Sequence, residues 1–383
     1  MSQCGSGKCW FKINFIFLLV PLLAILLAGC SVAGLESFAR ENEGASSAGG
    51  EGSTGSPYAK TDVLIPEDII TGGQREMSGV AGAFSRMLVG SGDEIHFLNP
   101  VSVGGVDNTL YIVDSGIPVD FDLADPFYAR SRPNLKPKSE PTVFCYDLVT
   151  KKIVSIDTIG MQFQGEPGDI YVRADGSFLV TDPVGKKVVY FDRNGGLLNT
   201  YSDPANLSRP IAVWVDEETQ EVYVADGTYS HIVVFDQFGK ALKAIGRRGN
   251  GPGRFRAITA MTMGRDGLYV LDRLELPIQV LTRDGVFQYS FGEMQHTFPT
   301  AIAVDQNQLV FVSERSDNTI RVYENGQLIA TVGGGGAAPG RFRLVNGLWV
   351  NQGFLYVADS QNRRIQVLRI NAPHTLELPM GMQ

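Results

Sequence analysis

Six carboxylates recur along this chain in one sequence context, and carboxylates are groups that can bind a metal or transfer a proton. Each of them closes a short run of apolar residues, as in the runs 110–114 and 222–226. The six acids are Asp114, Asp182, Asp226, Asp272, Glu314 and Asp359. A carboxylate at a turn can accept bonds from nearby backbone N–H groups. Because the acid recurs in every copy of the run, we predict a structural role for all six.

The spacing of these acids predicts the fold. They are 68, 44, 46, 42 and 45 residues apart, and a second apolar run starts six residues after five of them. In the first copy that gap is 29 residues, so residues 115–141 form an insertion in an otherwise regular unit. A period near 45 with several short strand-like runs per unit is typical of a propeller blade. The sequence therefore predicts an all-β, six-bladed β-propeller with four strands per blade and almost no helix.

A ring of blades must also be closed. Little chain remains for an outer strand after the last strong run, 365–370, because Pro373 and Pro379 interrupt the tail. Residues 86–92 resemble the outer-strand endings elsewhere, so we expect an N-terminal strand there to complete the last blade and remove an exposed edge. Residues 374–378 are the competing candidate.

The repeat resembles the NHL repeat family. The matching segments are 249–255 (Gly-Asn-Gly-Pro-Gly-Arg-Phe), 339–342 (Pro-Gly-Arg-Phe) and 356–367, which begins Tyr-Val-Ala-Asp. The resemblance covers about residues 84–370 and implies a six-bladed propeller. Propellers of this kind act as binding platforms and also host unrelated enzymes, so the resemblance leaves the function open.

The N-terminus has the features of a secretory signal. Lys8 and Lys12 precede an apolar run over residues 13–28, which ends in Leu-Ala-Gly before Cys30. This resembles bacterial lipoproteins, which implies that residues 1–29 are removed and that Cys30 is lipidated. Ser31 in place of an aspartate implies the outer membrane of the cell envelope. A transmembrane helix is the alternative, since the run approaches the lower length limit.

Composition separates a tether from a domain. The Gly-, Ser-, Ala- and Glu-rich chain up to about residue 60 predicts a flexible linker, assigned to residues 30–75, before a propeller at 76–383. The formal charge is −8, and removing residues 1–29 takes away two lysines and no acids, which gives −10. An acidic surface argues against nucleic-acid binding. Without residues 1–29 the chain keeps two cysteines, Cys30 and Cys145. Since Cys30 would carry the lipid, Cys145 would have no partner for a disulfide, and we expect it to be a small core residue.

The channel mouth of a propeller, where the inner strands begin, is the usual ligand site. Related lyases hold zinc there on histidines after the prolines of the inner strands. The matching positions here are Val101, Gly168, Ile211, Thr259, Thr300 and Asn346, and none is histidine. Lactonase-type propellers use carboxylates and an asparagine instead. Asp169, Thr259, Thr300 and Asn346 are therefore our candidate mouth residues, either for calcium or, as the simpler interpretation, for turns and channel water.

The insertion brings Phe121, Phe127 and Tyr128 among charged residues into a loop that five blades do without. Long loops on rigid scaffolds often bind partners, although this loop could simply cover its own blade. We therefore expect a membrane-anchored, non-catalytic platform that binds another protein or a small ligand, with no cofactor. A metal-dependent hydrolase or lyase at the channel mouth is the alternative. The sequence does not name the partner.

Overall fold

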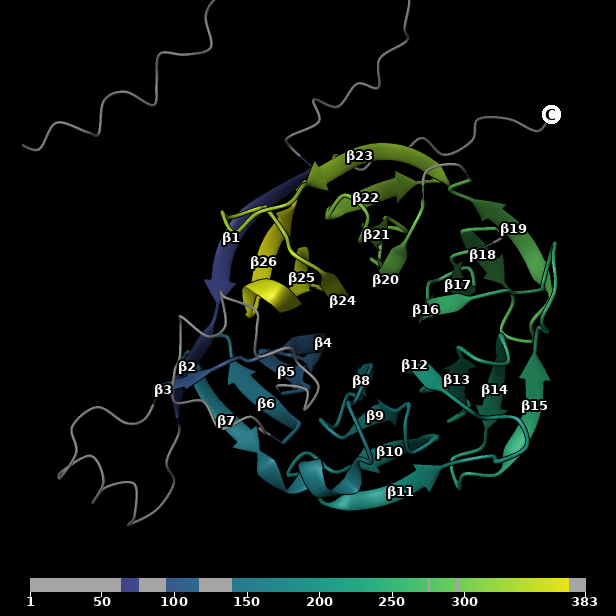
Figure 1. Cartoon of the computed structure of the whole chain (residues 1–383), viewed down its shortest axis with the longest axis horizontal. Coiled ribbons are helices and arrows are strands. Elements are labelled where there is room, and N and C mark those ends of the chain that lie inside the picture. The colour runs from purple at the N-terminus through teal and green to yellow at the C-terminus, as the bar shows by residue number, and fades with distance from the viewer. Residues whose placement is uncertain (1–62, 76–93, 117–139, 275, 294–295, 372–383) are drawn as a thin grey trace, which may run out of the picture. The chain divides into compact units, whose positions relative to one another are not determined.

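The computed structural model describes residues 63–75, 94–116, 140–274, 276–293 and 296–371 of the 383-residue chain. In this part of the chain six sheets, antiparallel except for one strand pair in blade 1, are arranged in a ring, like the blades of a propeller (Figure 1). Its only helices are two short 3₁₀ segments, η1 (Asp157–Gln162) and η2 (Ser360–Asn362). The prediction of an all-β, six-bladed propeller is confirmed.

Blades 2 to 5 each take their four strands from one continuous stretch of chain, in order from the centre outwards. Blade 2 holds β8 (Ile170–Val172), β9 (Phe178–Asp182), β10 (Lys187–Phe191) and β11 (Leu197–Tyr201). Blade 3 holds β12 (Pro210–Val215), β13 (Val222–Asp226), β14 (His231–Phe235) and β15 (Ala241–Ile245). Blade 4 holds β16 (Ile258–Met263), β17 (Leu268–Asp272), β18 (Ile278–Leu281) and β19 (Phe287–Phe291). Blade 5 holds β20 (Pro299–Val304), β21 (Val310–Glu314), β22 (Thr319–Glu324) and β23 (Gln327–Gly333).

Blade 1 carries two additional strands. Its four regular strands are β4 (Pro100–Val106), β5 (Thr109–Asp114), β6 (Thr142–Asp147) and β7 (Lys152–Ile156). Outside β7 the sheet continues with β2 (Gly72–Arg75), which pairs parallel to β7, and then with β3 (Glu94–His96). The insertion leaves the blade between β5 and β6, and Asp114 and Thr142 at its two ends are paired with each other.

Blade 6 closes the ring with a strand from the other end of the sequence. Its order is β1 (Leu64–Ile70), β26 (Arg364–Ile370), β25 (Phe354–Asp359) and β24 (Val345–Asn351). An N-terminal strand therefore completes the last blade, as expected, but it is β1 and lies upstream of residue 76, where we expected the propeller to begin. β1 fits because Leu64 and Ile70 at its ends are both buried, while the residues between them face solvent more. Residues 86–92 and 374–378 lie outside the described residues.

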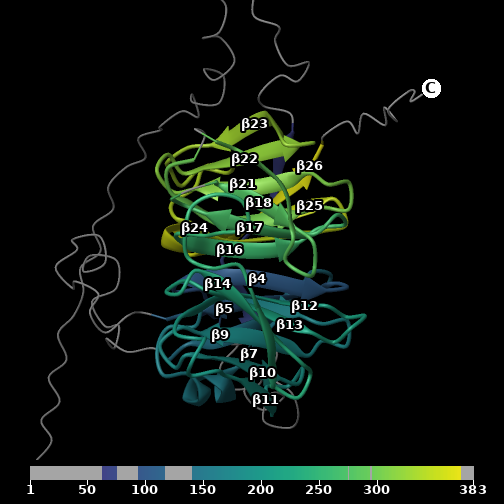
Figure 2. The same cartoon turned by 90° about the vertical axis from the view of Figure 1, so that its right-hand side faces the viewer.

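The hydrophobic core is divided into six clusters, and each lies between two neighbouring blades. The second strands of blades 2 to 5 are buried along their whole length, because both faces of these strands meet another blade. Figure 2 shows strands of blades 3 and 4 in neighbouring layers. Apolar packing between sheets thus fixes the ring and the positions of the loops at its two ends.

No helix in the described ranges has the length and apolar composition to cross a membrane.

Candidate functional site

The inner strands of the six blades lie around the ring axis (Figure 1). Residues at or next to the beginning of these strands line a cavity of about 260 Å³, which we call the mouth. All six positions that the repeat predicted for the channel mouth line this cavity. They are Val101, Gly168, Ile211, Thr259, Thr300 and Asn346. These positions come together because each inner strand starts at the same end of its blade, next to the acid that ends the second strand, as Pro210 pairs with Asp226.

Asp169 is the carboxylate that the described residues place in the mouth. Its Oδ1 accepts a hydrogen bond from Ser102 Oγ in β4 at 2.9 Å. Its Oδ2 accepts one from the Val213 N–H in β12 at 3.1 Å. Asp169 precedes β8, so this one side chain joins blades 1, 2 and 3. Burial raises the pKa of Asp169 to about 6, although these hydrogen bonds act in the opposite direction.

The neutral polar groups of the mouth also bond to protein partners. Thr300 Oγ1 donates to the Val345 carbonyl at 2.6 Å and lies 2.7 Å from Ser313 Oγ. Asn346 Nδ2 donates to Ser360 Oγ at 3.0 Å, and Ser360 Oγ donates to the Pro100 carbonyl at 2.6 Å. These contacts join blade 5 to blade 6 and blade 6 to blade 1.

Thr259 Oγ1, the remaining candidate, reaches the Leu271 carbonyl of its own blade at 3.5 Å, the longest of these contacts. Together the candidate residues form a rim of hydrogen bonds around the mouth. Sequence reasoning missed Ser102 and Ser360, whose hydroxyls complete the contacts between blades. Ser102 directly follows the mouth position Val101, and Ser360 directly follows the recurring acid Asp359.

No cluster of three or more His, Cys, Asp or Glu side chains with metal-binding geometry occurs within the described ranges. The histidines of this part lie away from the mouth. His231 opens β14 and its Nε2 contacts the Asn206 carbonyl at 2.6 Å, while His96 ends β3.

The six recurring acids have the predicted structural role. All are nearly inaccessible, with at most 2% of their surface exposed. Asp226 illustrates the geometry: Oδ2 accepts from the N–H groups of Ser208 and Arg209 before the inner strand, and Oδ1 accepts from Thr228 and Tyr229 after its own strand. Each acid thereby fixes two turns at the mouth end of its blade.

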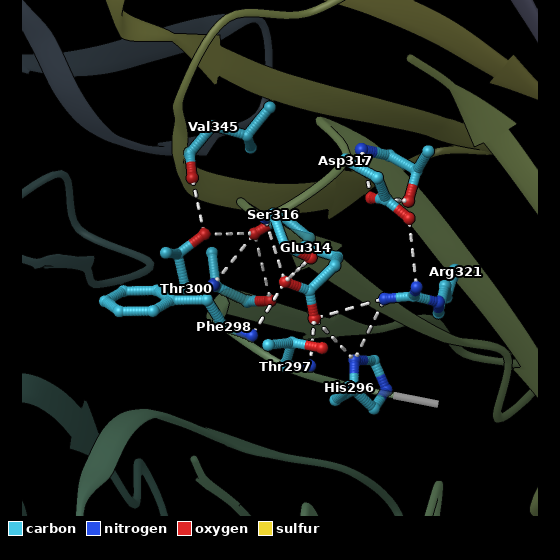
Figure 3. Close-up of polar contacts among 12 residues, drawn as sticks. His296, Thr297, Phe298, Thr300, Glu314, Ser316, Asp317, Arg321 and Val345 are labelled. Atoms are coloured by element: carbon cyan, nitrogen blue, oxygen red, sulfur yellow. Dashed lines mark hydrogen bonds and ion pairs between the residues drawn. The ribbon is translucent and has the colours of Figure 1, made fainter. Parts of the chain in front are cut away.

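Blade 5 keeps this pattern with a longer glutamate in place of the aspartate. Glu314 accepts from the Thr297 and Phe298 N–H groups at 2.9 and 2.7 Å and forms an ion pair with Arg321 at 3.1 Å (Figure 3). Burial alone would raise the pKa of Glu314, but its hydrogen bonds, first those from Ser316, outweigh burial and hold the pKa below its usual value.

His296 belongs to the same network. Its Nδ1 lies 3.5 Å from Glu314 Oε2, and its Nε2 lies 2.6 Å from the Tyr323 hydroxyl. Burial, together with the positive charge of Arg321, lowers the pKa of His296 to about 4. The ring is therefore neutral at pH 7. The side chains of His296 and Glu314 are almost completely buried, at 1% and 0% exposure (Figure 3).

Four of the remaining sequence-based candidates cannot be placed. Cys30 and the insertion residues Phe121, Phe127 and Tyr128 lie outside the described residues, so their assignments stay predictions. Cys145 lies in β6 and is half-buried, and burial raises the pKa of its thiol to about 12, as expected for a packed rather than a reactive cysteine.

Apolar side chains are exposed in one repeated turn at the mouth end. Val184, Tyr229 and Leu274 are 59%, 43% and 51% exposed, and each lies in the turn after the second strand of blade 2, 3 or 4. In blade 1 the same turn is the insertion. Sequence reasoning missed this set, although an apolar residue within three positions of the recurring acid, in an otherwise polar turn, is a readable signal.

Comparison with known proteins agrees on the class of protein. Residues 212–331 match a family, DUF5128, that is described as a 6-bladed beta-propeller. A protein of unknown function from Bacteroides thetaiotaomicron has a similar structure, with a TM-score of 0.53, 13% identity and coverage of 71% of this chain and 70% of that one. Virginiamycin B lyase from Staphylococcus aureus gives a TM-score of 0.48, 12% identity and coverage of 71% and 95%. No curated protein matches the sequence. At these identities the likeness is one of fold.

Proposed function

We propose that this chain is a lipid-anchored protein of the bacterial cell envelope and that its propeller is a non-catalytic platform for another protein. The observation that carries the proposal is that the polar side chains of the mouth are hydrogen-bonded to other parts of the protein. Both carboxylate oxygens of Asp169 and the Thr300 hydroxyl bond to other blades, and the Asn346 amide bonds to Ser360, whose hydroxyl bonds to Pro100 of blade 1. Groups used in this way stiffen the ring, and a rigid ring with variable turns suits the presentation of a binding surface.

The turns at the mouth end supply the contact chemistry. Val184, Tyr229 and Leu274 occupy equivalent turns of three consecutive blades, and the insertion leaves the next blade at the same position. Exposed apolar and aromatic groups within a polar surface are typical of the centre of a protein interface. The aromatic residues predicted in the insertion would extend the same surface.

The anchor rests on the sequence of the N-terminus. A signal that ends in Leu-Ala-Gly before Cys30 supports lipidation, and Ser31 supports delivery to the outer membrane. An acidic domain on a flexible tether then faces the aqueous side of the envelope, where it can reorient toward partners.

Affinity capture from solubilised membranes tests the platform. Tagged full-length protein should enrich one or a few proteins, and V184S/Y229S/L274S should reduce their recovery about tenfold. The matched control is F238S/L242S, which replaces exposed apolar residues on the outer edge of blade 3 and should leave recovery unchanged. Equal recovery with both variants would place the contact elsewhere, and recovery of no specific protein by the wild type would argue against a platform.

A metal-dependent hydrolase or lyase is the alternative function. The observation in its favour is Asp169 itself, a carboxylate in a cavity at the ring axis with a pKa near the range of a general base. To bind a cation such as calcium, the two oxygens of Asp169 would have to lose their hydrogen bonds from Ser102 and Val213.

A further inference from the structure

A second and larger cavity, of about 640 Å³, lies between blades 1 and 2 toward the end of the ring away from the mouth. Blade 1 contributes the β4–β5 turn and parts of β6 and β7, and blade 2 contributes the turns before β9 and after β10. Val106, Val154 and Ile156 supply apolar walls, and Tyr111 and Arg193 supply polar groups. The volume is in the range of small-molecule sites.

The internal repeat shows what occupies the equivalent place between blades 3 and 4. There the Tyr223 hydroxyl donates to Glu221 Oε2 at 3.1 Å and lies 3.3 Å from the Arg283 carbonyl. The Arg283 guanidinium forms an ion pair with Asp216 at 3.0 Å. Two carboxylates of blade 3 thus satisfy a tyrosine and an arginine. In blade 4 the corresponding tyrosine, Tyr269, likewise donates to a carboxylate, that of Asp266, at 2.8 Å.

Blade 1 keeps the tyrosine but lacks both acids. Tyr111 matches Tyr223 because each lies three residues before the acid that ends its second strand, and Arg193 matches Arg283 in the turn after the third strand. The positions of Asp216 and Glu221 are occupied by Val106 and Thr109, which cannot accept a charge-assisted bond in the same way.

Tyr111 and Arg193 are consequently left without an acidic partner. Among the described residues the Tyr111 hydroxyl has no hydrogen-bond partner, and Arg193 forms no ion pair and donates only to the Asp175 carbonyl. The Asp175 carboxylate is itself bonded to Ser177. Asp107 also lines the cavity and is exposed, as Arg193 is, and no ion pair joins the two within the described ranges.

The two polar groups converge on one point. A Cβ added to Gly176 would lie 3.1 Å from the Tyr111 hydroxyl and 3.3 Å from Arg193 Nη2, so the two polar atoms lie near enough to each other for one carboxylate beside the glycine to contact both. Burial raises the pKa of Tyr111 to about 12, and its hydroxyl is therefore a proton donor throughout the physiological range. A neutral donor beside a guanidinium is a suitable pair for a carboxylate.

We propose that this cavity binds a small carboxylate ligand with a short apolar body. Its carboxylate lies between Tyr111 and Arg193, where blade 3 places its own acids, and its body contacts Val106, Val154 and Ile156. This site is separate from the mouth and from the exposed turns, so the proposal of a carboxylate site does not depend on the proposed platform function.

Ligand-detected NMR on the full-length protein in detergent tests the site, with isovalerate and phenylacetate as probes and isovaleramide as the neutral control. We expect saturable binding of at least one carboxylate and about tenfold weaker binding of the amide. R193Q should weaken carboxylate binding about tenfold or more, since a bond to a charged group is lost. The matched control R283Q, at the equivalent but internally paired position, should bind as the wild type does.

A second variant supplies the missing acids. V106D/T109E copies the acids of blade 3 into blade 1 and should abolish binding without lowering the melting temperature, and T109E alone serves if the double variant does not fold. The proposal is overturned if no carboxylate probe binds the wild type, if the amide binds equally well, or if R193Q retains full affinity. Loss of binding in R193Q with unchanged capture of protein partners separates this site from the platform.

Discussion

At the residue scale, the recurring acids and the mouth residues differ in how they use hydrogen bonds. The acid of each blade joins turns of its own blade, as Asp226 does, whereas Asp169 joins three blades. The first role could be predicted because it repeats with the sequence. The second could not, because Ser102 lies 67 residues from Asp169 in the sequence and only the closed ring brings them together.

The pH dependence of the free energy of unfolding tests the buried environments of His296 and Asp169. The folded pKa of His296, about 4, lies below its ordinary value of 6.5, so the unfolded chain binds more protons between these values and stability increases with pH there. The folded pKa of Asp169, about 6, lies above its ordinary 3.8, so the folded chain binds more protons and stability decreases with pH over an overlapping window. Each effect amounts to about 3 kcal/mol, and the two oppose each other.

Single variants should separate the two effects. Between pH 4 and 6, the free energy of unfolding of H296Q should fall with rising pH relative to the wild type, and that of D169N should rise relative to it. Chemical denaturation at several pH values measures both slopes. Parallel curves for the wild type and either variant would contradict the environment assigned to that residue.

Metal analysis addresses the enzymatic alternative at the same scale. Because Ser102 and Val213 occupy the oxygens of Asp169, elemental analysis of protein purified without chelators should find well under one zinc or calcium per chain. About one tightly held ion, lost in D169N or N346A, would instead support the hydrolase or lyase.

At the scale of elements, the spacing of the repeat predicted most strands but not the strand that closes the ring. The strands of blades 2 to 5 follow from a period that recurs with little change. An outer strand is half exposed and pairs on one side only, so its sequence is weakly constrained, and residues 86–92 were as plausible as β1. What distinguishes β1 is the burial of Leu64 and Ile70 between blades, which requires the assembled ring.

The signal segment gives the next prediction. C30A should remain unprocessed or leave the membrane fraction, because the acyl chains that hold the mature protein would have no attachment site. Fractionation with mass spectrometry of the N-terminus measures both effects, and C145A is the matched control. An unchanged N-terminus together with unchanged membrane partition would exclude lipidation.

The insertion gives a prediction about binding. Replacing residues 117–139 by a short turn should change the free energy of unfolding by only about 1 kcal/mol, since loop length adds little closure entropy and Asp114 is already paired with Thr142. Partner capture should be lost. If the shortened protein still captures every partner, the insertion only covers its blade and the exposed turns of blades 2 to 4 suffice.

At the scale of the whole molecule, stability depends on contacts between blades more than within them, since all six core clusters span two sheets. Removing residues 31–62 should therefore leave the melting temperature unchanged. Removing residues 31–75 deletes β1 and β2, exposes β26 and uncovers the apolar contacts of Val63, Leu64 and Ile70, at a cost of about 5 kcal/mol. Calorimetry compares the two, and equal melting temperatures would show that β1 does not hold the ring.

The pairing of β1 with β26 also sets an order of events for a chain that is made from its N-terminus. β1 is the first of the described strands to be synthesised, and its partner, which includes Ile370, is the last. Blades 2 to 5 can form as soon as each is complete, but β1 has no neighbour until synthesis is nearly finished. Such distant pairing slows folding and leaves an unpaired strand in the meantime, one able to pair with another copy of the chain. A protein built in this way would benefit from a chaperone that shields its first strand until the last strand has been synthesised.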